Sequence, residues 1–213
     1  MEKAQNKYNI ENIIKVINIE EYREVPKIKE DKMTISYNEV TKFWFEEIKP
    51  EQRWKKNAEF DAVIAKRFGD VHEKATRGEL KFWRRNALGT LAEIIVLDQF
   101  SRNIFRDTPS AFASDELALE AAKEAIEKGY DKELDINYRS FLYMPFMHSE
   151  STNVHEIAMK LFNQKGLEGS YDYEVKHKNI IDRFGRYPHR NEILDRESTS
   201  EEIEFLKGPD SSF

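Results

Sequence analysis

The segment over residues 78–105 carries apolar side chains on almost every face of a helix, and no other feature constrains the fold as strongly. Leu88, Leu91 and the run at 94–97 follow one another too closely to form a single stripe. A helix that is apolar all round must be covered by other elements on every side. The sequence therefore predicts a central helix over 78–105 that is buried among other helices.

Shorter stretches on either side show the apolar spacing of amphipathic helices. Ser36 and Glu39 form a capping box, so one helix is expected to begin there and to end before Pro50. A second helix is expected over 58–68, with Gly69 as its left-handed C-terminal residue. Further helices are expected to end near residues 129, 166 and 185, and a last short helix follows a second capping box at 198–201.

Two details of the later helices follow from single residues. Pro145 cannot donate a hydrogen bond to a preceding turn, so it is expected to end the stretch at 141–144. A new element is then expected to begin at 147–151. Further on, Tyr173 and His177 share a stripe with apolar residues and are expected to face inward.

Composition limits the class of protein. The chain has 213 residues, with 34 Lys and Arg against 40 Asp and Glu, and its net charge of -6 argues against binding to nucleic acid or to anionic membranes. It has no cysteine, which fits a reducing cytoplasm. Its longest apolar run, at 94–97, is far shorter than the ~20 residues of a membrane span. We predict a cytoplasmic all-α protein with an N-terminal arm over 1–35 and one domain of seven or more helices over 36–213.

The common nucleotide and metal signatures are missing. The sequence has no G-x-G-x-x-G motif and no Walker loop. The closest match to a zinc-protease motif begins at His155, but Met159 stands where the second histidine is needed. We therefore expect no cofactor and no metal ion, and the residues alone assign no catalytic group.

Polar side chains follow the buried run directly. Asp98 and Arg102 share a helix face at i, i+4, and Arg106 lies one turn further on. Two arginines one turn apart can grip one carboxylate or phosphate. Alternatively, Asp98 pairs with Arg102 and Arg106 stabilises the C-terminal end of the helix. In that case the side-chain amide of Asn103 binds a loop carbonyl. The candidate ligand-binding residues of this stretch are Asp98, Gln99, Arg102, Asn103 and Arg106.

A second polar group follows Pro145. His148 and Glu150 stand at an expected helix start, where a histidine and a carboxylate can act as an acid–base pair and free amides favour anions. The alternative is that Ser149 caps the helix and Glu150 is a favourable first-turn charge. Both His148 and Glu150 are candidate ligand-binding residues.

The third group is a cationic loop in an acidic protein. His177 lies on the apolar stripe before it, where a histidine is more often a hydrogen-bonded core residue than a ligand. Loops position functional groups, and the density of cationic donors here favours an anion site. The alternative is a loop held by salt bridges to surface acids. The candidates are His177, Arg183, Arg186, His189 and Arg190.

Four stretches resemble one uncharacterised bacterial family, the one catalogued as domain of unknown function 924. They read LDQFSRNIFR at 97–106, FLYMPFMHSE at 141–150, DRFGRYPHRN at 182–191 and STSEEIEFL at 198–206. The resemblance covers about 36–213 and implies an antiparallel helical array similar to tetratricopeptide-like superhelices. It implies no established activity and transfers no catalytic residue. Ser101 departs from the family pattern, because many members carry a proline there.

Three functions remain open. The first is binding of a small anionic molecule or an acidic peptide in a pocket lined by arginine and histidine. The second is an enzyme in which His148 or His177 acts as a general base with a carboxylate beside it, or in which a histidine and a carboxylate hold a metal. The third is a scaffold that binds a partner protein through apolar anchors. The sequence does not determine the oligomeric state.

Overall fold

The computed structural model describes residues 35–209 and residue 211. Contacts within the chain divide it between residues 34 and 35, and the description concerns the second unit alone. The arm expected over 1–35 lies outside the described residues except for Ile35.

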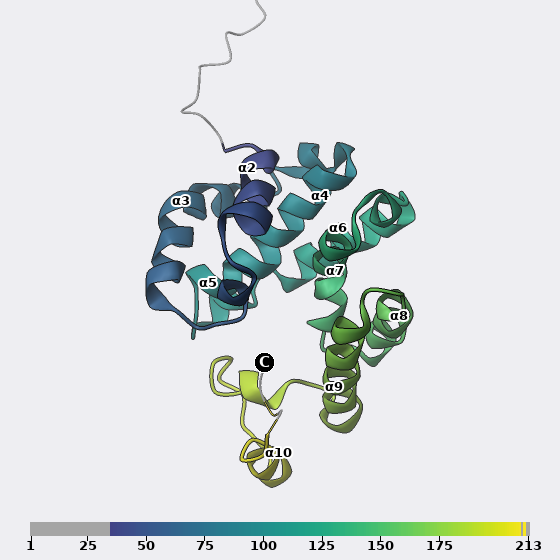
Figure 1. The fold of residues 1–213 in the computed structure, drawn as a ribbon. Helices are drawn as coiled ribbons and strands as arrows, with labels where there is room; N and C mark the ends of the chain where they lie inside the picture. Colours follow the sequence, from purple (N-terminus) through teal and green to yellow (C-terminus); the bar gives the residue numbers. More distant parts are fainter. Residues whose placement is uncertain (1–34, 210, 212–213) are drawn as a thin grey trace, which may run out of the picture. The chain divides into compact units, whose positions relative to one another are not determined.

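Helices account for every regular element of the described part, and it contains no β-strand, which confirms the all-α prediction (Figure 1). The prediction of seven or more helices also holds there. The similarity to tetratricopeptide superhelices stays a prediction. The α-helices are α2 (Tyr37–Lys42), α3 (Ala58–Thr76), α4 (Ala87–Ile95), α5 (Ser101–Ile104), α6 (Asp115–Glu127), α7 (Ile136–Met147), α8 (Thr152–Phe162), α9 (Glu168–Phe184) and α10 (Ser200–Phe205).

Short helical turns of other types connect these helices. Two are π-helical, at Phe43–Glu47 and at Val96–Phe100. The others are 3₁₀ turns at Pro50–Arg53, Lys81–Arg85, Pro109–Ala111, Tyr130–Glu133 and Pro188–Arg190.

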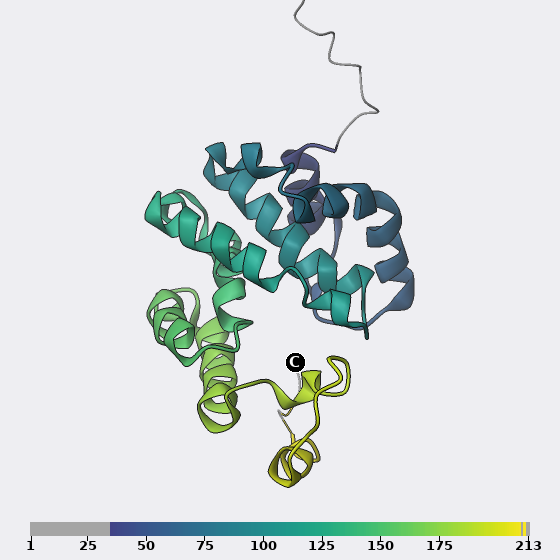
Figure 2. The ribbon, with the colours of Figure 1, turned by 180° about the vertical axis from the view of Figure 1, so that it is seen from behind.

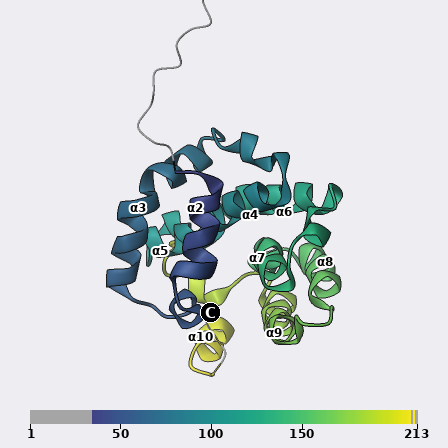
Figure 3. The ribbon, with the colours of Figure 1, turned by 45° about the horizontal axis from the view of Figure 1, so that its top comes forward.

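Neighbouring helices pack in two groups. Helix α4 contacts α2, α6 and α7, and α3 contacts the π-helical turn and α5 that follow α4. Helices α7, α8 and α9 lie side by side in Figures 1 and 3. After α9 the chain leaves this second group and continues to α10, as the view from behind shows (Figure 2).

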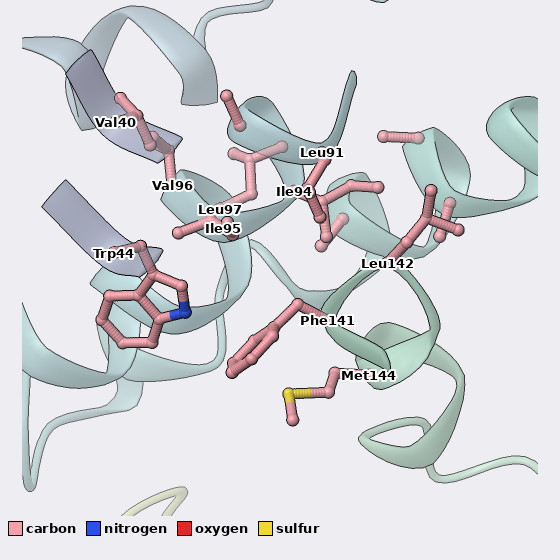
Figure 4. Packing of buried hydrophobic residues seen from close by; sticks show 14 of the residues in the cluster. Val40, Trp44, Leu91, Ile94, Ile95, Val96, Leu97, Phe141, Leu142 and Met144 are labelled. Carbon is pink, nitrogen blue, oxygen red and sulfur yellow. The ribbon is translucent and has the colours of Figure 1, made fainter. Parts of the chain in front are cut away.

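The core forms around α4, as the apolar segment predicts. Ile94, Leu97 and Trp44 are fully buried, and they pack with Phe141 and Leu142 of α7 (Figure 4). The Trp44 ring meets the Phe141 ring edge to face, with 5.8 Å between the centroids. This arrangement favours the opposed charge distributions of ring face and ring edge.

The central segment is divided instead of forming one helix over 78–105. A 3₁₀ turn at Lys81–Arg85 ends at Asn86, which has an extended backbone and caps α4 by accepting a hydrogen bond from the Gly89 amide at 2.8 Å. A Cβ atom at Gly89 would lie 2.2 Å from the carbonyl oxygen of Trp83. This close backbone approach requires glycine and explains the break. The start of the segment is also less buried than expected, because Phe82 is exposed.

Other boundaries differ from the predictions for local reasons. Helix α3 continues through Gly69 to Thr76, and Gly78, with a φ of +74°, takes the left-handed position instead. Pro145 lies inside the last turn of α7, where buried Met144 and Phe146 on either side hold it in the core. Residue 147 therefore still belongs to α7, residues 148–151 are not helical, and the next helix, α8, begins at Thr152.

The capping boxes are better predicted. Ser36 and Glu39 form the expected reciprocal pair at the start of α2. At the start of α10 the box is formed by Thr199 and Glu202, one residue later than expected. Helix α9 ends at Gly185 in the left-handed conformation, as predicted.

Candidate functional site

Asp98 and His148 form the centre of a polar cluster. Asp98 lies in the π-helical turn after α4 and His148 directly follows α7, and the Asp98 Oδ1 to His148 Nδ1 distance is 2.6 Å. Burial alone would raise the pKa of the Asp98 carboxyl, but the Arg102 guanidinium and the imidazole bring it well below its usual range. The carboxylate is therefore ionised and accepts a hydrogen bond from Nδ1 of the imidazole.

His148 itself is neutral near pH 7. Burial lowers its pKa, and the charge of Arg102 acts in the same direction, whereas Asp98 acts against both. With the proton on Nδ1, the lone pair is on Nε2. The His148 side chain keeps 16% exposure. The result is an oriented neutral imidazole at the edge of the core.

Two arginines connect this pair to α6. Arg102 Nη1 lies 3.0 Å from Asp98 Oδ1 and 3.0 Å from Asp115 Oδ1. Arg190 Nη1 donates to Asp115 Oδ2 at 3.2 Å, and its Nη2 donates to the His148 carbonyl oxygen at 3.1 Å. The Arg190 guanidinium lies 4.6 Å from the centroids of the Phe112 and Tyr187 rings. Arg190 thus joins three separate segments of the chain.

His177 of α9 approaches the same place. Its ring centroid lies 6.5 Å from that of His148 and 5.7 Å from that of Tyr187. Its Nδ1 donates to the Tyr173 carbonyl oxygen at 2.8 Å, and burial lowers the pKa of His177 to about 3. The predicted inward orientation of His177 is confirmed, but Tyr173 is exposed, so the buried stripe of α9 is shifted from the one expected.

A second histidine and acid pair is buried more deeply than the first. His155 and Glu174 are both fully buried, with 2.7 Å between Nδ1 and Oε1. His155 Nε2 donates to the Ser149 carbonyl oxygen at 2.9 Å, and the Tyr187 hydroxyl donates to the Met147 carbonyl oxygen at 2.5 Å. Because both imidazole nitrogens are engaged within the protein, this pair is a structural support for the loop that carries His148.

Glu150 and His189 lie at the side of the cluster. Glu150 accepts from both Arg196 terminal nitrogens, at 2.6 and 3.0 Å, and from the Tyr187 amide at 2.7 Å. His189 lies against the Tyr187 ring, and burial lowers its pKa to about 4. Glu150 therefore fixes the loop and does not orient His148. Ser151, not Ser149, occupies the capping position of α8.

The remaining candidates lie elsewhere or serve the cluster indirectly. Gln99 donates to Asp98 Oδ2 at 2.6 Å. Asn103 and Arg106 both bind Asp61 of α3, at 2.8 and 2.6 Å. Arg183 and Arg186 bind Glu201 and Glu202 of the α10 helix, at 2.7 Å each. The structure thus brings together Asp98, Gln99, Arg102, His148, Glu150, His177, His189 and Arg190, and it places Asn103, Arg106, Arg183 and Arg186 in separate ion pairs or hydrogen bonds.

Sequence reasoning missed Asp115, Glu174, Tyr187 and Arg196. Asp115 is in the first turn of α6, where an acid is expected for helix stability alone. Glu174 does carry a signal, since it lies three residues before His177 on one helix face in an otherwise apolar position. The arginines of the cluster are each paired with an acid, and the three cations Arg102, Arg190 and Arg196 face the three anions Asp98, Asp115 and Glu150.

The fold and the cluster define an all-α protein with a buried polar site between its helices. No group of three or more histidine, aspartate or glutamate side chains in the described residues has the arrangement of a metal site. Nor does that part of the chain contain a helix long and apolar enough to span a membrane.

Comparisons with known proteins give the family. The model for "Bacterial protein of unknown function (DUF924)" matches residues 40–210, and the chain belongs to this family. A solved structure, the protein of unknown function ATU0120 from Agrobacterium tumefaciens, is 39% identical with a TM-score of 0.77, over 81% of this chain and 97% of that one. No curated protein matches the chain.

Proposed function

We propose that the Asp98–His148 pair is the general base of an enzyme that acts on a small molecule carrying a carboxylate or phosphate. The observation that carries this proposal is the 2.6 Å contact between a buried ionised carboxylate and a partly exposed neutral imidazole. A carboxylate that fixes the tautomer of a histidine and stabilises its protonated form is the arrangement that general base catalysis needs.

The hydrogen bond from His148 Nδ1 to Asp98 determines that Nε2 is the nitrogen that accepts the proton. His148 Nε2 takes a proton from a carbon or oxygen next to the anionic group of the substrate. The imidazolium that forms keeps its hydrogen bond from Nδ1 to Asp98, whose negative charge stabilises it. The substrate is left with extra negative charge, and the nearby Arg102, with 22% of its side chain exposed, offsets this charge.

Arginine pairing limits how an anion can bind. Arg102 already faces Asp98 and Asp115, so a ligand anion adds to a neutral cluster and does not fill a vacant cationic pocket. Such a site binds the ligand weakly and gains affinity as charge develops during reaction, which favours catalysis over tight storage of an anion.

The test combines a binding screen with an exchange assay. A panel of phosphorylated and carboxylated metabolites is screened by thermal shift, and compounds that raise the melting temperature are incubated with the protein in D₂O. Mass spectrometry then measures deuterium uptake or conversion. We expect wild-type protein to exchange at least one compound and His148→Gln to lose about 10²-fold or more of that rate.

Arg183→Gln is the matched control, because Arg183 is exposed and pairs with Glu201 outside the cluster. It should keep the wild-type exchange rate. Equal exchange by His148→Gln, or no exchange of any compound by the wild type, would contradict the proposal. Binding of a compound without exchange would instead favour the simple anion-binding function.

The scaffold function has less support. The exposed aromatic residues Trp54, Phe82 and Tyr173 lie in three separate parts of the chain, whereas a partner helix needs a single apolar face.

A further inference from the structure

A groove lies between α3 and the segment that follows α5, and its lining differs from that of the Asp98–His148 cluster. Its volume of about 410 Å³ falls in the range of small-molecule sites, roughly 300–1,000 Å³. Ile104, Phe105 and Ala113 supply apolar surface, whereas Thr76, Ser110 and Ser114 supply hydroxyl groups. The remaining lining residues are Gly69, His72 and Glu73.

His72 lines this groove, and its hydrogen bond to Ser101 determines which ring nitrogen is an acceptor. The Ser101 hydroxyl donates to the Leu97 carbonyl oxygen at 2.5 Å, so it can only accept from His72 Nε2, which lies 2.7 Å away. The proton of the imidazole is therefore on Nε2 and the lone pair is on Nδ1. No described residue gives that Nδ1 a hydrogen-bond donor, although the His72 residue is only 6% exposed.

The charge of the lining residues indicates the charge of the ligand. Glu73 is the one acidic residue of the lining, and no lysine or arginine is among the lining residues. The Glu73 side chain is largely exposed and pairs with Arg77 outside the groove, a type of contact that a ligand cation can replace at little cost. The lining residues therefore offer a group of opposite charge to a cation and none to an anion.

The apolar part of the lining fits an aromatic ring. The Phe105 ring meets the His72 ring at 5.1 Å between centroids, and Ile104 extends this surface. A flat apolar ligand body placed there removes apolar area from water and gains edge-to-face ring contacts.

We propose that this groove binds a small aromatic amine, whose ring lies on Phe105 and Ile104 and whose nitrogen donates to His72 Nδ1 near the Glu73 carboxylate. The site is separate from the proposed general base and does not depend on it. It uses a buried histidine that the proposed reaction leaves unused.

The experiment uses 2-phenylethylamine as the probe, with phenylacetate as its anionic counterpart. Titration is followed by the ¹⁵N shift of the His72 ring and by the melting temperature. We expect the His72 Nδ1 resonance to move toward the value of a hydrogen-bonded acceptor, and phenylacetate to bind at least tenfold more weakly than the amine. His72→Phe, which keeps the ring volume, should lose about tenfold or more in affinity, as for a hydrogen bond to a charged group.

Two further variants keep the test decisive. Ser101→Ala keeps the imidazole but removes the hydroxyl that fixes its proton on Nε2, so its affinity for the amine should lie between that of wild type and that of His72→Phe. Ser110→Phe fills the groove from an exposed position and should abolish binding without lowering the melting temperature. The proposal is overturned if the amine does not bind, if phenylacetate binds equally well, or if either His72→Phe or Ser110→Phe retains wild-type affinity.

Discussion

Arg190 is the residue whose removal should do most damage to the cluster. Arg190 is 6% exposed, and its guanidinium lies close to the rings of Phe112 and Tyr187 and binds the Asp115 carboxylate and the His148 carbonyl oxygen. Replacement by alanine removes all of these contacts together. It also leaves Asp115 with Arg102 as its one cationic partner in the cluster.

The expected loss of stability follows from these contacts. Breaking a buried ion pair costs about 3–5 kcal/mol when the remaining charge has no other partner. Asp115 keeps Arg102, so the lower end of that range applies, and the loss of contact with two rings adds roughly 1 kcal/mol. We expect Arg190→Ala to lower the free energy of unfolding by about 4 kcal/mol, which corresponds to a fall in melting temperature of roughly 8–16 °C.

Thermal unfolding followed by circular dichroism measures this effect. Arg183→Ala is the control, because Arg183 is 51% exposed and its pair with Glu201 should contribute about 1 kcal/mol or less. If Arg190→Ala and Arg183→Ala melt within about 2 °C of each other, the joining role assigned to Arg190 is wrong.

Three further predictions concern stability. Burial lowers the pKa of His177 to about 3, against ~6.5 in the unfolded chain, so below pH 6.5 the unfolded chain binds one more proton than the folded one. The free energy of unfolding therefore falls as the pH drops from 6.5 toward 3, by up to about 1.4 kcal/mol per pH unit. His177→Phe should flatten the slope of melting temperature against pH, and equal slopes would refute this. Arg84→Met leaves the fully buried Glu93 unpaired and should cost about 3–5 kcal/mol in thermal unfolding, most of it recovered when Glu93→Leu is added. Gly69→Ala meets no atom within 4 Å inside α3 and should raise the melting temperature by about 2–4 °C, whereas Gly89→Ala, blocked by a carbonyl oxygen at 2.2 Å, should lower it.

The sequence predicted the elements of the fold better than their limits. The apolar segment and the capping box at Ser36 depend on residues close in sequence, so local patterns were sufficient for them. Gly69 and Pro145 do not end their helices as predicted. Buried residues before and after each of them hold the helix against the core, and this packing outweighs the local preference to end the helix. Helix ends therefore depended on tertiary contacts that no local pattern contains.

The polar cluster was also predicted only in part, because most of its contacts join residues that are far apart in sequence. The i, i+4 spacing indicated the pairing of Asp98 with Arg102. The contact between Asp98 and His148 spans fifty residues and required the fold. Arg186 and Arg190 are close in sequence, but the 3₁₀ turn at Pro188–Arg190 separates them, so that Arg186 pairs with Glu202 and Arg190 with Asp115.

The π-helical turn at Val96–Phe100 has a consequence for engineering the molecule. Such a turn holds one residue more than an ordinary helical turn of the same height. Deleting one residue of this turn would therefore restore regular winding and leave α5 in nearly its present register, whereas a deletion inside α4 would rotate everything downstream by about 100°. Asp98 is one of the residues of the turn, so the deletion would displace the Asp98–His148 contact while Ser101 and Arg102 kept nearly the same helix faces.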